Sequence, residues 1–372
     1  MVDPARHARQ LVLPGFGETA QRALTTARVL VIGAGGLGSA VLPHLVGAGV
    51  ATAKGGRLGI IDDDVIALSN LHRQHLHTTA DLGRLKVESA AERMLALDPA
   101  VRLRLYRDRL RAETALALLA DYDLLVDGSD GFATRYLAVD AATLRGIPLV
   151  WGSVLQFDGQ VGVAPVGGPG FRDLFPQAPT GDVLDCATGG VLPVVCGVIG
   201  SLMAAQVIAL ITGVGAPLIG RVTTYDARTG RLREVAYGHD PEARAVTELT
   251  DAELEPRANS VPEPEPAVIL PRELAGLLDP TNKGAAPLLL DVREPWEFEL
   301  VALPGARLAP LGQLAGTLAE LPRDRTIIAY CHHGVRSQHA LDLLRDAGFD
   351  ARHLVGGIDA WAYDVDPAMP RY

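Results

Sequence analysis

Residues 28–38 read Arg-Val-Leu-Val-Ile-Gly-Ala-Gly-Gly-Leu-Gly, an apolar run that ends in closely spaced glycines. The apolar run predicts a buried strand, and the mainly apolar residues after Gly38 predict a helix. Glycines at such a junction allow backbone N–H groups and the helix N-terminus to face an anion, which favours a phosphate-binding loop. Taken alone, a loop of this kind most often binds NAD or FAD.

The polar residues that follow this loop shift the prediction towards ATP. Asp62 comes directly after a second apolar run, where a carboxylate suits a ribose hydroxyl in either class of enzyme. Arg73 and Lys86 come next, and Asp130 follows in the segment Asp127-Gly-Ser-Asp130. A hydride-transfer enzyme needs no cations aimed at a triphosphate, whereas adenylation must neutralise the charge that builds on the α-phosphate and on pyrophosphate. The set therefore predicts ATP-dependent adenylation.

Together with the entry segment Arg6-His-Ala-Arg9-Gln10, these motifs resemble the MoeB/ThiF group of the ubiquitin-activating enzyme superfamily. Members of that group adenylate the C-terminal Gly-Gly of small sulfur-carrier proteins. The resemblance runs from about Arg6 to about Arg233 and implies a Rossmann-like, doubly wound α/β fold. It also implies a homodimer in which Arg9 reaches the partner subunit's phosphates.

The same resemblance implies a role for each polar motif. Asp62 would hold the ribose, Asp130 would bind Mg²⁺, and Arg73 and Lys86 would act with Arg9 in catalysis. The residues expected to bind the ATP are Gly33, Gly35, Gly36, Gly38, Asp62, Asp64, Ser69, Asn70, Arg73, Gln74, Lys86 and Asp130. The neighbouring histidines at 72, 75 and 77 match no zinc-ligand spacing, so we expect no metal there.

A second informative segment lies near the other end of the chain. Residues 326–330 read Thr-Ile-Ile-Ala-Tyr, which predicts a short buried strand, and Cys331 follows at the turn into a helix. Backbone N–H groups, a helix dipole and Arg336 at such a turn would stabilise a thiolate or a persulfide anion. The loop comprises Cys331, His332, His333, Gly334, Val335, Arg336 and Ser337.

With Leu290-Asp-Val-Arg-Glu294, Pro304-Gly-Ala306 and Gly356-Gly-Ile-Asp-Ala-Trp361, this loop resembles a single rhodanese domain over residues 268–372. Such a domain is a small α/β fold that carries sulfur on its cysteine. The family usually has a histidine where Ala302 stands, which we interpret as a change of scaffold that leaves the loop intact.

Length and composition also favour two domains. The chain has 372 residues, more than one hydrophobic core normally supports. We expect an adenylation domain over 1–239, a Pro/Glu-rich linker over 240–267 and the rhodanese domain over 268–372. A net charge of −10 argues against nucleic-acid binding.

The segment from Ala187 to Gly220 is uncharged and long, but its prolines, Gln206 and glycines favour a buried core helix over a membrane span. Since the first residues lack the apolar core of a signal peptide, we expect a cytoplasmic protein.

Three cysteines fit a reducing compartment and predict no disulfide framework. Cys186 lies where the resemblance places a reactive cysteine in a mobile loop, so it is a candidate catalytic thiol beside Cys331. Cys196 lies within an apolar run and is expected to pack as a small hydrophobic residue.

Some positions depart from the resemblance. Many relatives hold zinc with two Cys-x-x-Cys pairs, but here the corresponding positions read Gly170-Phe-Arg-Asp173 and Ala243-Arg-Ala-Val246, so no structural zinc is expected. Gly131 replaces the usual Asn after the magnesium acid. Residues 51–55 look like an insertion that lengthens a surface turn.

The implied function is adenylation of a carrier's Gly-Gly carboxylate, followed by sulfur transfer from a Cys331 persulfide. A cysteine desulfurase or thiosulfate would supply the sulfur, and a thiocarboxylate would result. Molybdopterin, thiamine, cysteine and tRNA-thiolation routes all use this chemistry, so the pathway stays open. Two alternatives also remain: an activating enzyme that forms a thioester on Cys186 with the rhodanese domain as a docking module, and a dinucleotide-dependent oxidoreductase fused to a sulfurtransferase.

Overall fold

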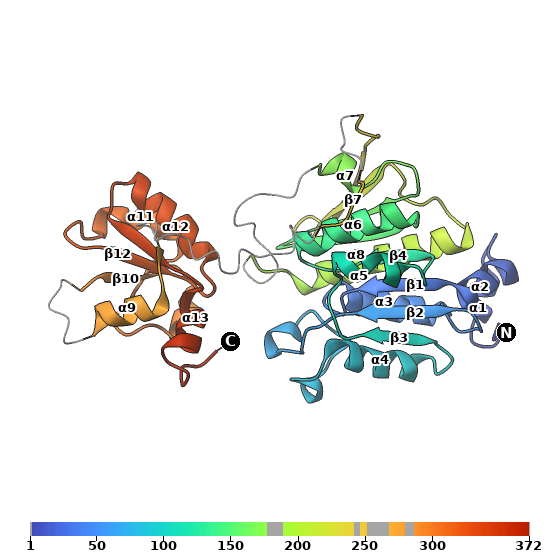
Figure 1. Ribbon diagram of the computed structural model, residues 1–372, viewed down its shortest axis with the longest axis horizontal. Coiled ribbons are helices and arrows are strands. Elements are labelled where there is room, and N and C mark those ends of the chain that lie inside the picture. The colour runs from blue at the N-terminus through green and yellow to red at the C-terminus, as the bar shows by residue number, and fades with distance from the viewer. Residues whose placement is uncertain (1, 177–188, 242–245, 251–267, 280–285, 372) are drawn as a thin grey trace. The chain divides into compact units, whose positions relative to one another are not determined.

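A computed structural model describes residues 2–176, 189–241, 246–250, 268–279 and 286–371 (Figure 1). The chain divides into two compact units, Met1–Pro256 and Arg257–Tyr372. The division falls within the expected linker 240–267. Leu249, which also belongs to that segment, packs against the core of the first unit.

The first unit is built on an eight-stranded sheet in the order β3-β2-β1-β4-β5-β6-β7-β8. Strands β3, β2, β1, β4 and β5 are parallel, whereas β6, β7 and β8 are antiparallel to their neighbours. The strands are β1 (Arg28–Ile32), β2 (Arg57–Ile61), β3 (Leu103–Tyr106), β4 (Leu124–Asp127), β5 (Leu149–Leu155), β6 (Asp158–Ala164), β7 (Arg221–Asp226) and β8 (Arg231–Ala236).

Helices cover both faces of this sheet, because the central strands are apolar on both sides. In β1, Val29 and Val31 face one core cluster while Leu30 and Ile32 face the other. The first cluster includes α2 (Gly17–Thr26), α3 (Gly38–Gly47), α4 (Lys86–Leu97) and α8 (Pro193–Thr212). The second includes α5 (Ala112–Leu119), α6 (Phe132–Arg145) and α7 (Phe171–Leu174), and α1 (Ala8–Leu11) packs beside α2. The doubly wound α/β architecture expected from the sequence is confirmed.

Helix α8 is long and apolar enough to cross a membrane by length and composition, with 44% of its most apolar stretch buried within the protein. It contacts α2, α3, β5 and β6. Its buried residues include Val195, Ile199, Met203 and Val207, which recur every four residues and therefore line one side of the helix. This packing is that of a core helix against a sheet.

The segment 51–55 differs from its expected form. Lys54 and Gly55 are exposed, but Ala51 is fully buried at a φ of 60°. Its N–H donates to the Leu24 carbonyl, and its own carbonyl accepts from the N–H of Arg102. The expectation of a surface turn is therefore wrong at Ala51, because its backbone joins α2 to the start of β3.

The second unit has a parallel five-stranded sheet in the order β11-β10-β12-β13-β9. Helices α11 and α12 pack on one face, and α9 and α13 pack on the other (Figure 1). The elements are β9 (Val268–Ile269), α9 (Pro271–Leu278), β10 (Leu288–Asp291), α10 (Pro295–Leu300), β11 (Arg307–Leu308), α11 (Leu311–Thr317), β12 (Ile327–Tyr330), α12 (Val335–Asp346), β13 (Ala351–Leu354) and α13 (Gly357–Asp364). This is the small α/β unit that the sequence predicts.

Candidate active sites

The phosphate loop lies between β1 and α3, at the carboxyl end of the parallel strands. Gly33 has a φ of +89°, which a residue with a side chain rarely adopts. The N–H of Ala34 donates to Asp62 Oδ2 at 2.8 Å, so the loop is tied directly to the carboxylate that follows β2. Burial raises the pKa of Asp62, and Lys86 opposes that shift. Asp62, the residue predicted to bind the ribose, and the predicted phosphate loop therefore form one site.

Two of the predicted cations already have partners beside this loop. Lys86 is the first residue of α4 and donates to Asp64 Oδ2 at 2.6 Å. Arg73 Nη1 donates to the Ser69 carbonyl at 3.0 Å, and its Cδ lies close to Gly36. The Arg73 side chain thus passes beside the loop, and the Lys86 charge acts on Asp62, which is hydrogen-bonded to the loop, so both cations are suited to neutralise phosphate charge.

Gln74 and Asn70 occupy the same region. Gln74 is buried against Gly35, and its Oε1 has no hydrogen-bond partner within the part of the chain that the structure describes. A buried polar atom without a partner is costly, so this oxygen is suited to accept a donor from a bound ligand. Asn70 Oδ1 accepts from the Ala67 N–H at 3.2 Å and shapes the turn that carries Ser69.

Asp130 lies exposed on the loop after β4, and a buried ion pair below it holds that loop. Arg135 Nε donates to Asp127 Oδ2 at 2.9 Å, and Nη2 donates to the carbonyls of Ser129 and Gly152, each at 2.7 Å. Sequence reasoning missed Arg135, because an arginine in the first turn of a helix is usually solvated. An exposed carboxylate next to a phosphate loop suits Mg²⁺, which typically takes one or two carboxylates plus phosphate oxygens.

Cys196 is buried as expected, yet it lies inside the candidate ATP site. A Cβ placed on Gly36 would be 2.9 Å from the Cys196 sulfur, so a larger residue there would require the thiol to shift. Burial raises the pKa of Cys196, while Arg73 lowers it and Asp130 raises it further. The thiol is therefore a packing partner of the phosphate loop, near both charged groups.

Arg9 is also a predicted site residue, but within one chain it lies away from the residues around the phosphate loop. It is exposed on α1, where its neighbour Gln10 donates to Gln21 Oε1 at 2.8 Å and to the Ala48 carbonyl at 3.0 Å. Ala48 follows the C-terminus of α3, whereas the phosphate loop precedes the N-terminus of that helix. A ten-residue helix is about 15 Å long, so α1 lies at the end of α3 remote from the loop.

In the second unit, Cys331 follows the fully buried strand β12 and is only 2% exposed. The N–H of Gly334 donates to Cys331 Sγ at 3.1 Å, and Gly334, with a φ of +104°, precedes α12. The carbonyls of Cys331 and His332 accept from the N–H groups of Ile358 and Asp359 at 2.9 and 3.1 Å. The first residues of α13 thus hold the loop backbone, and the Gly334 N–H donates to the sulfur.

The charged groups around Cys331 are largely paired. Arg336 donates to both carboxylate oxygens of the buried Glu297, at 2.6 and 2.7 Å. The rings of His332 and His333 stack with centroids 4.0 Å apart. Burial, followed by the charge of His333, lowers the pKa of His332 to about 4. The sequence suggested that Arg336 stabilises the thiolate directly, whereas in the structure its guanidinium binds Glu297.

Two expectations, one on Cys186 and one on the replaced zinc pairs, involve positions that lie wholly or partly outside the described residues. Cys186 lies outside the described residues, as do Ala243, Arg244 and Ala245 of one replaced zinc pair. At the other, the Gly170 N–H donates to Asp173 Oδ2 at 2.7 Å at the start of α7.

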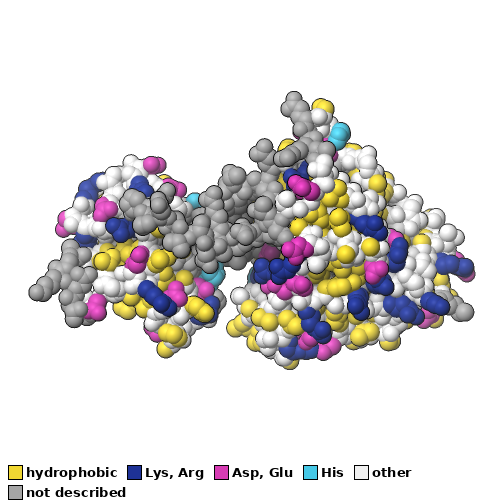
Figure 2. Space-filling view, in the orientation of Figure 1, with side chains coloured by type: hydrophobic (Ala, Val, Ile, Leu, Met, Phe, Trp, Pro, Cys, Tyr) yellow, Lys and Arg dark blue, Asp and Glu magenta, His cyan; other side chains and the backbone are white. Residues whose placement is uncertain are grey.

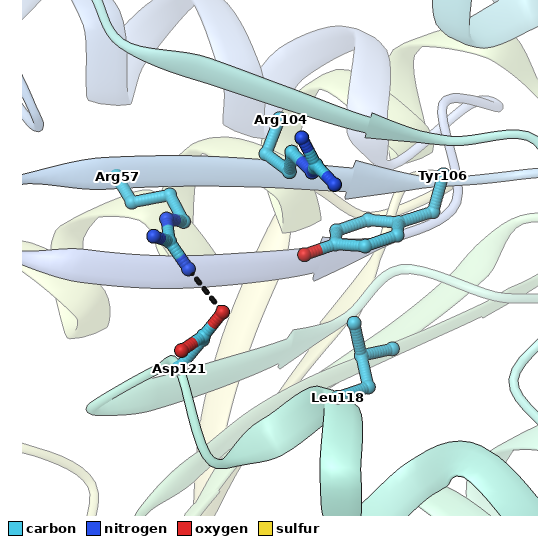
Figure 3. A pocket seen from close by; sticks show the side chains of 5 residues that line it. All are labelled: Arg57, Arg104, Tyr106, Leu118 and Asp121. Atoms are coloured by element: carbon cyan, nitrogen blue, oxygen red, sulfur yellow. Dashed lines mark hydrogen bonds and ion pairs between the residues drawn. The ribbon is translucent and has the colours of Figure 1, made fainter.

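A separate hollow of about 400 Å³ lies on the α5 side of β2 and β3. Arg57 forms an ion pair with Asp121 there, and Arg104 and Tyr106 lie alongside (Figure 3). None of the predicted ATP ligands lines this hollow. On the face shown in Figure 2, basic and acidic side chains are interspersed over both units, as in this pair.

Residues 7–245 match the ThiF family, and residues 271–364 match the Rhodanese-like domain. The chain belongs to the ThiF family and carries a C-terminal rhodanese domain. It is 45% identical over 99% of its length to the probable adenylyltransferase/sulfurtransferase MoeZ of Mycobacterium tuberculosis, of which it covers 95%. It is 37% identical to the adenylyltransferase and sulfurtransferase MOCS3-1 of Zea mays, over 99% of the chain and 83% of that protein.

The first domain alone has further relatives. The sulfur carrier protein adenylyltransferase of Thermus thermophilus is 46% identical over 63% of this chain and 88% of its own length. The crystal structure of E. coli MccB with ATP has a TM-score of 0.55 at 19% identity, over 65% of this chain and 74% of that one, and so shares the fold. The chain is an enzyme, both an adenylyltransferase and a sulfurtransferase, and the oxidoreductase alternative is set aside.

Proposed function

We propose that this enzyme uses Mg·ATP to adenylate the C-terminal Gly-Gly carboxylate of a small ubiquitin-like sulfur carrier, and then converts that carboxylate to a thiocarboxylate. The observation that carries the proposal is the pairing, in one chain, of two anion sites. One is a phosphate loop tied to Asp62, and the other is a buried thiol whose sulfur accepts the Gly334 N–H. The first suits a nucleotide, and the second suits a persulfide.

In the first step, the carrier carboxylate attacks the α-phosphate of ATP, and pyrophosphate leaves. Asp62 binds the ribose, while Arg73 and Lys86 neutralise charge on the phosphates. Gln74 Oε1, buried and without a partner among the described residues, accepts a donor once the site is filled. Asp130 would hold the magnesium, which supplies further charge neutralisation when bound.

Arg9 completes this site from the partner subunit of a homodimer. Its helix is tied to the end of α3 remote from the phosphate loop, so Arg9 is suited to act on a second subunit rather than its own. Its exposed side chain is available for that contact.

In the second step, the terminal sulfur of a Cys331 persulfide attacks the acyl-adenylate carbonyl, and AMP leaves. The product is an acyl disulfide between the carrier and Cys331. A second thiolate, assigned to Cys186, then attacks the Cys331 sulfur, which releases the carrier thiocarboxylate and leaves a Cys186–Cys331 disulfide. A cellular thiol reduces that disulfide. The persulfide itself is supplied by a cysteine desulfurase or by thiosulfate.

The tether between the two units offers a reason for their fusion. Linking two sites converts transfer of the activated carrier into an intramolecular event with a raised effective concentration.

Two variants test this proposal. Asp130→Ala should abolish carrier-dependent exchange of pyrophosphate into ATP while it retains thiosulfate sulfurtransfer, because the two chemistries use separate sites. Cys331→Ser should do the reverse, and the carrier adenylate should accumulate, since a hydroxyl cannot hold sulfane sulfur. Mass spectrometry of the carrier reads both products. Loss of both activities in a folded Asp130→Ala protein would contradict the assignment. A carrier that forms a thioester on Cys186 as readily in Cys331→Ser as in the parent would favour the thioester alternative.

A further inference from the structure

His77 lies in the turn that leads from Arg73 to α4, and it is only 5% exposed. Both of its ring nitrogens have partners on other segments. Nε2 lies 3.0 Å from the carbonyl oxygen of Ala34, within the phosphate loop, and Nδ1 lies 2.9 Å from the Ser89 hydroxyl on α4.

The chemistry of these partners determines the state of the imidazole. A carbonyl oxygen only accepts hydrogen bonds, so Nε2 carries the hydrogen and donates it to Ala34. Nδ1 is then an acceptor, and the Ser89 hydroxyl donates to it. Burial lowers the pKa of His77, as do the neighbouring Lys86 and Arg93, while the hydrogen bond to Ala34 and the charge of Asp81 oppose this shift. The ring is accordingly neutral at neutral pH.

Through these contacts, one side chain joins three segments of the ATP site. Ala34 is held on both sides, because its N–H donates to Asp62 while its carbonyl accepts from His77. Ser89 lies one turn after Lys86 on α4. The backbone N–H of His77 also donates to the carbonyl of Gln74 at 3.0 Å. A shift of this imidazole would therefore move the phosphate loop relative to the groups that approach it.

We propose that His77 is a positioning residue for nucleotide binding, which holds the Ala34 carbonyl against α4 and thereby orders the phosphate loop. The inference rests on the proposed ATP site and adds a residue to it. A loop that is ordered beforehand binds its ligand more tightly, because binding no longer has to restrict it.

Two amide substitutions separate the contacts of His77. In His77→Gln the side-chain amide reaches the position of Nε2 and can still donate to Ala34. In His77→Asn the shorter amide oxygen replaces Nδ1, so the Ser89 contact is retained and the Ala34 contact is lost. His75→Asn is the matched control, since His75 is exposed two residues away.

The affinity of the full-length chain for α,β-methylene-ATP with Mg²⁺ is measured by calorimetry. Hydrogen exchange of the peptide covering residues 33–37 is followed by mass spectrometry without nucleotide. His77→Asn should bind the analogue at least tenfold more weakly and exchange this peptide at least tenfold faster. His75→Asn should remain within threefold of the parent in both readouts. His77→Gln keeps the Ala34 contact but loses the Ser89 contact, so it should lose three- to tenfold in each readout, less than His77→Asn.

Each other result overturns the inference. His77→Asn with parent-like affinity and exchange would show that the Ala34 contact does not order the loop. Equal losses in folded His77→Gln and His77→Asn would assign the effect to packing. If His77→Asn fails to fold, Ser89→Ala replaces it as the test. We expect Ser89→Ala to bind the analogue three- to tenfold more weakly than the parent, and parent-like binding would contradict the inference. A parent chain that does not bind the analogue would instead refute the proposed ATP site, and the inference with it.

Discussion

A methyl group added at Gly38 tests the geometry of the phosphate loop directly. A Cβ at this position would lie 3.0 Å from the carbonyl carbon of Gly33 and closer still to its oxygen, whereas ordinary contacts begin near 3.4 Å. Both atoms belong to backbone, so no side chain can rotate away. The Gly33 carbonyl would have to move by about 1 Å, and displacements of about that size can cost on the order of 100-fold in rate.

Gly47, at the other end of the same helix, provides a matched control. A Cβ there would meet nothing within 4 Å, and this glycine is exposed. Replacing a helical glycine with alanine stabilises a helix by up to about 1 kcal/mol. We therefore expect Gly47→Ala to keep full activity with an equal or higher Tm.

The assay is carrier-dependent exchange of labelled pyrophosphate into ATP, with thiosulfate sulfurtransfer by Cys331 as an internal control. Gly38→Ala should lose about 100-fold in exchange and retain sulfurtransfer. The reasoning would be refuted if Gly38→Ala exchanged pyrophosphate within threefold of the parent, because the loop would then tolerate the displacement that the structure requires.

Three further predictions concern the sulfurtransferase unit and metal content. Gly357 has a φ of +62°, and a Cβ there would press on the carbonyls of Cys331 and His332, so Gly357→Ala should reduce thiosulfate sulfurtransfer at least tenfold while leaving pyrophosphate exchange intact. Burial lowers the pKa of His332 from 6.5 to about 4 in the folded chain. As the pH falls below 6.5, the unfolded chain therefore takes up a proton on His332 before the folded chain does, and the free energy of unfolding decreases until the pH nears 4. Urea unfolding of the full chain between pH 7 and pH 4 should show this loss, and His332→Asn should flatten it. The purified chain should contain no stoichiometric zinc, because both Cys-x-x-Cys positions are replaced; one zinc per chain by elemental analysis would overturn this expectation.

The amino-acid sequence alone was sufficient for the architecture, and it nominated the candidate ligands, which stay predictions. The strand predicted before the glycine loop is β1, and the run at 326–330 contains β12. These predictions succeeded because apolar runs and turn glycines act locally, within a few residues of the feature they specify. Asp62 and Cys331 were predicted as site residues on the same local basis, and the structure places each directly after a buried strand.

Only the tertiary structure decided which of these side chains act together. Arg135 contacts Asp127 beneath the Asp130 loop, Cys196 packs against Gly36, and Glu297 engages Arg336. Likewise, His77 reaches Ala34, 43 residues earlier in the chain. Such contacts join separate elements, so they depend on how those elements pack and orient. The spacing of residues along the sequence does not predict that packing. For that reason the sequence indicated the chemistry of the sites, while the fold determined which neighbours hold each group in place.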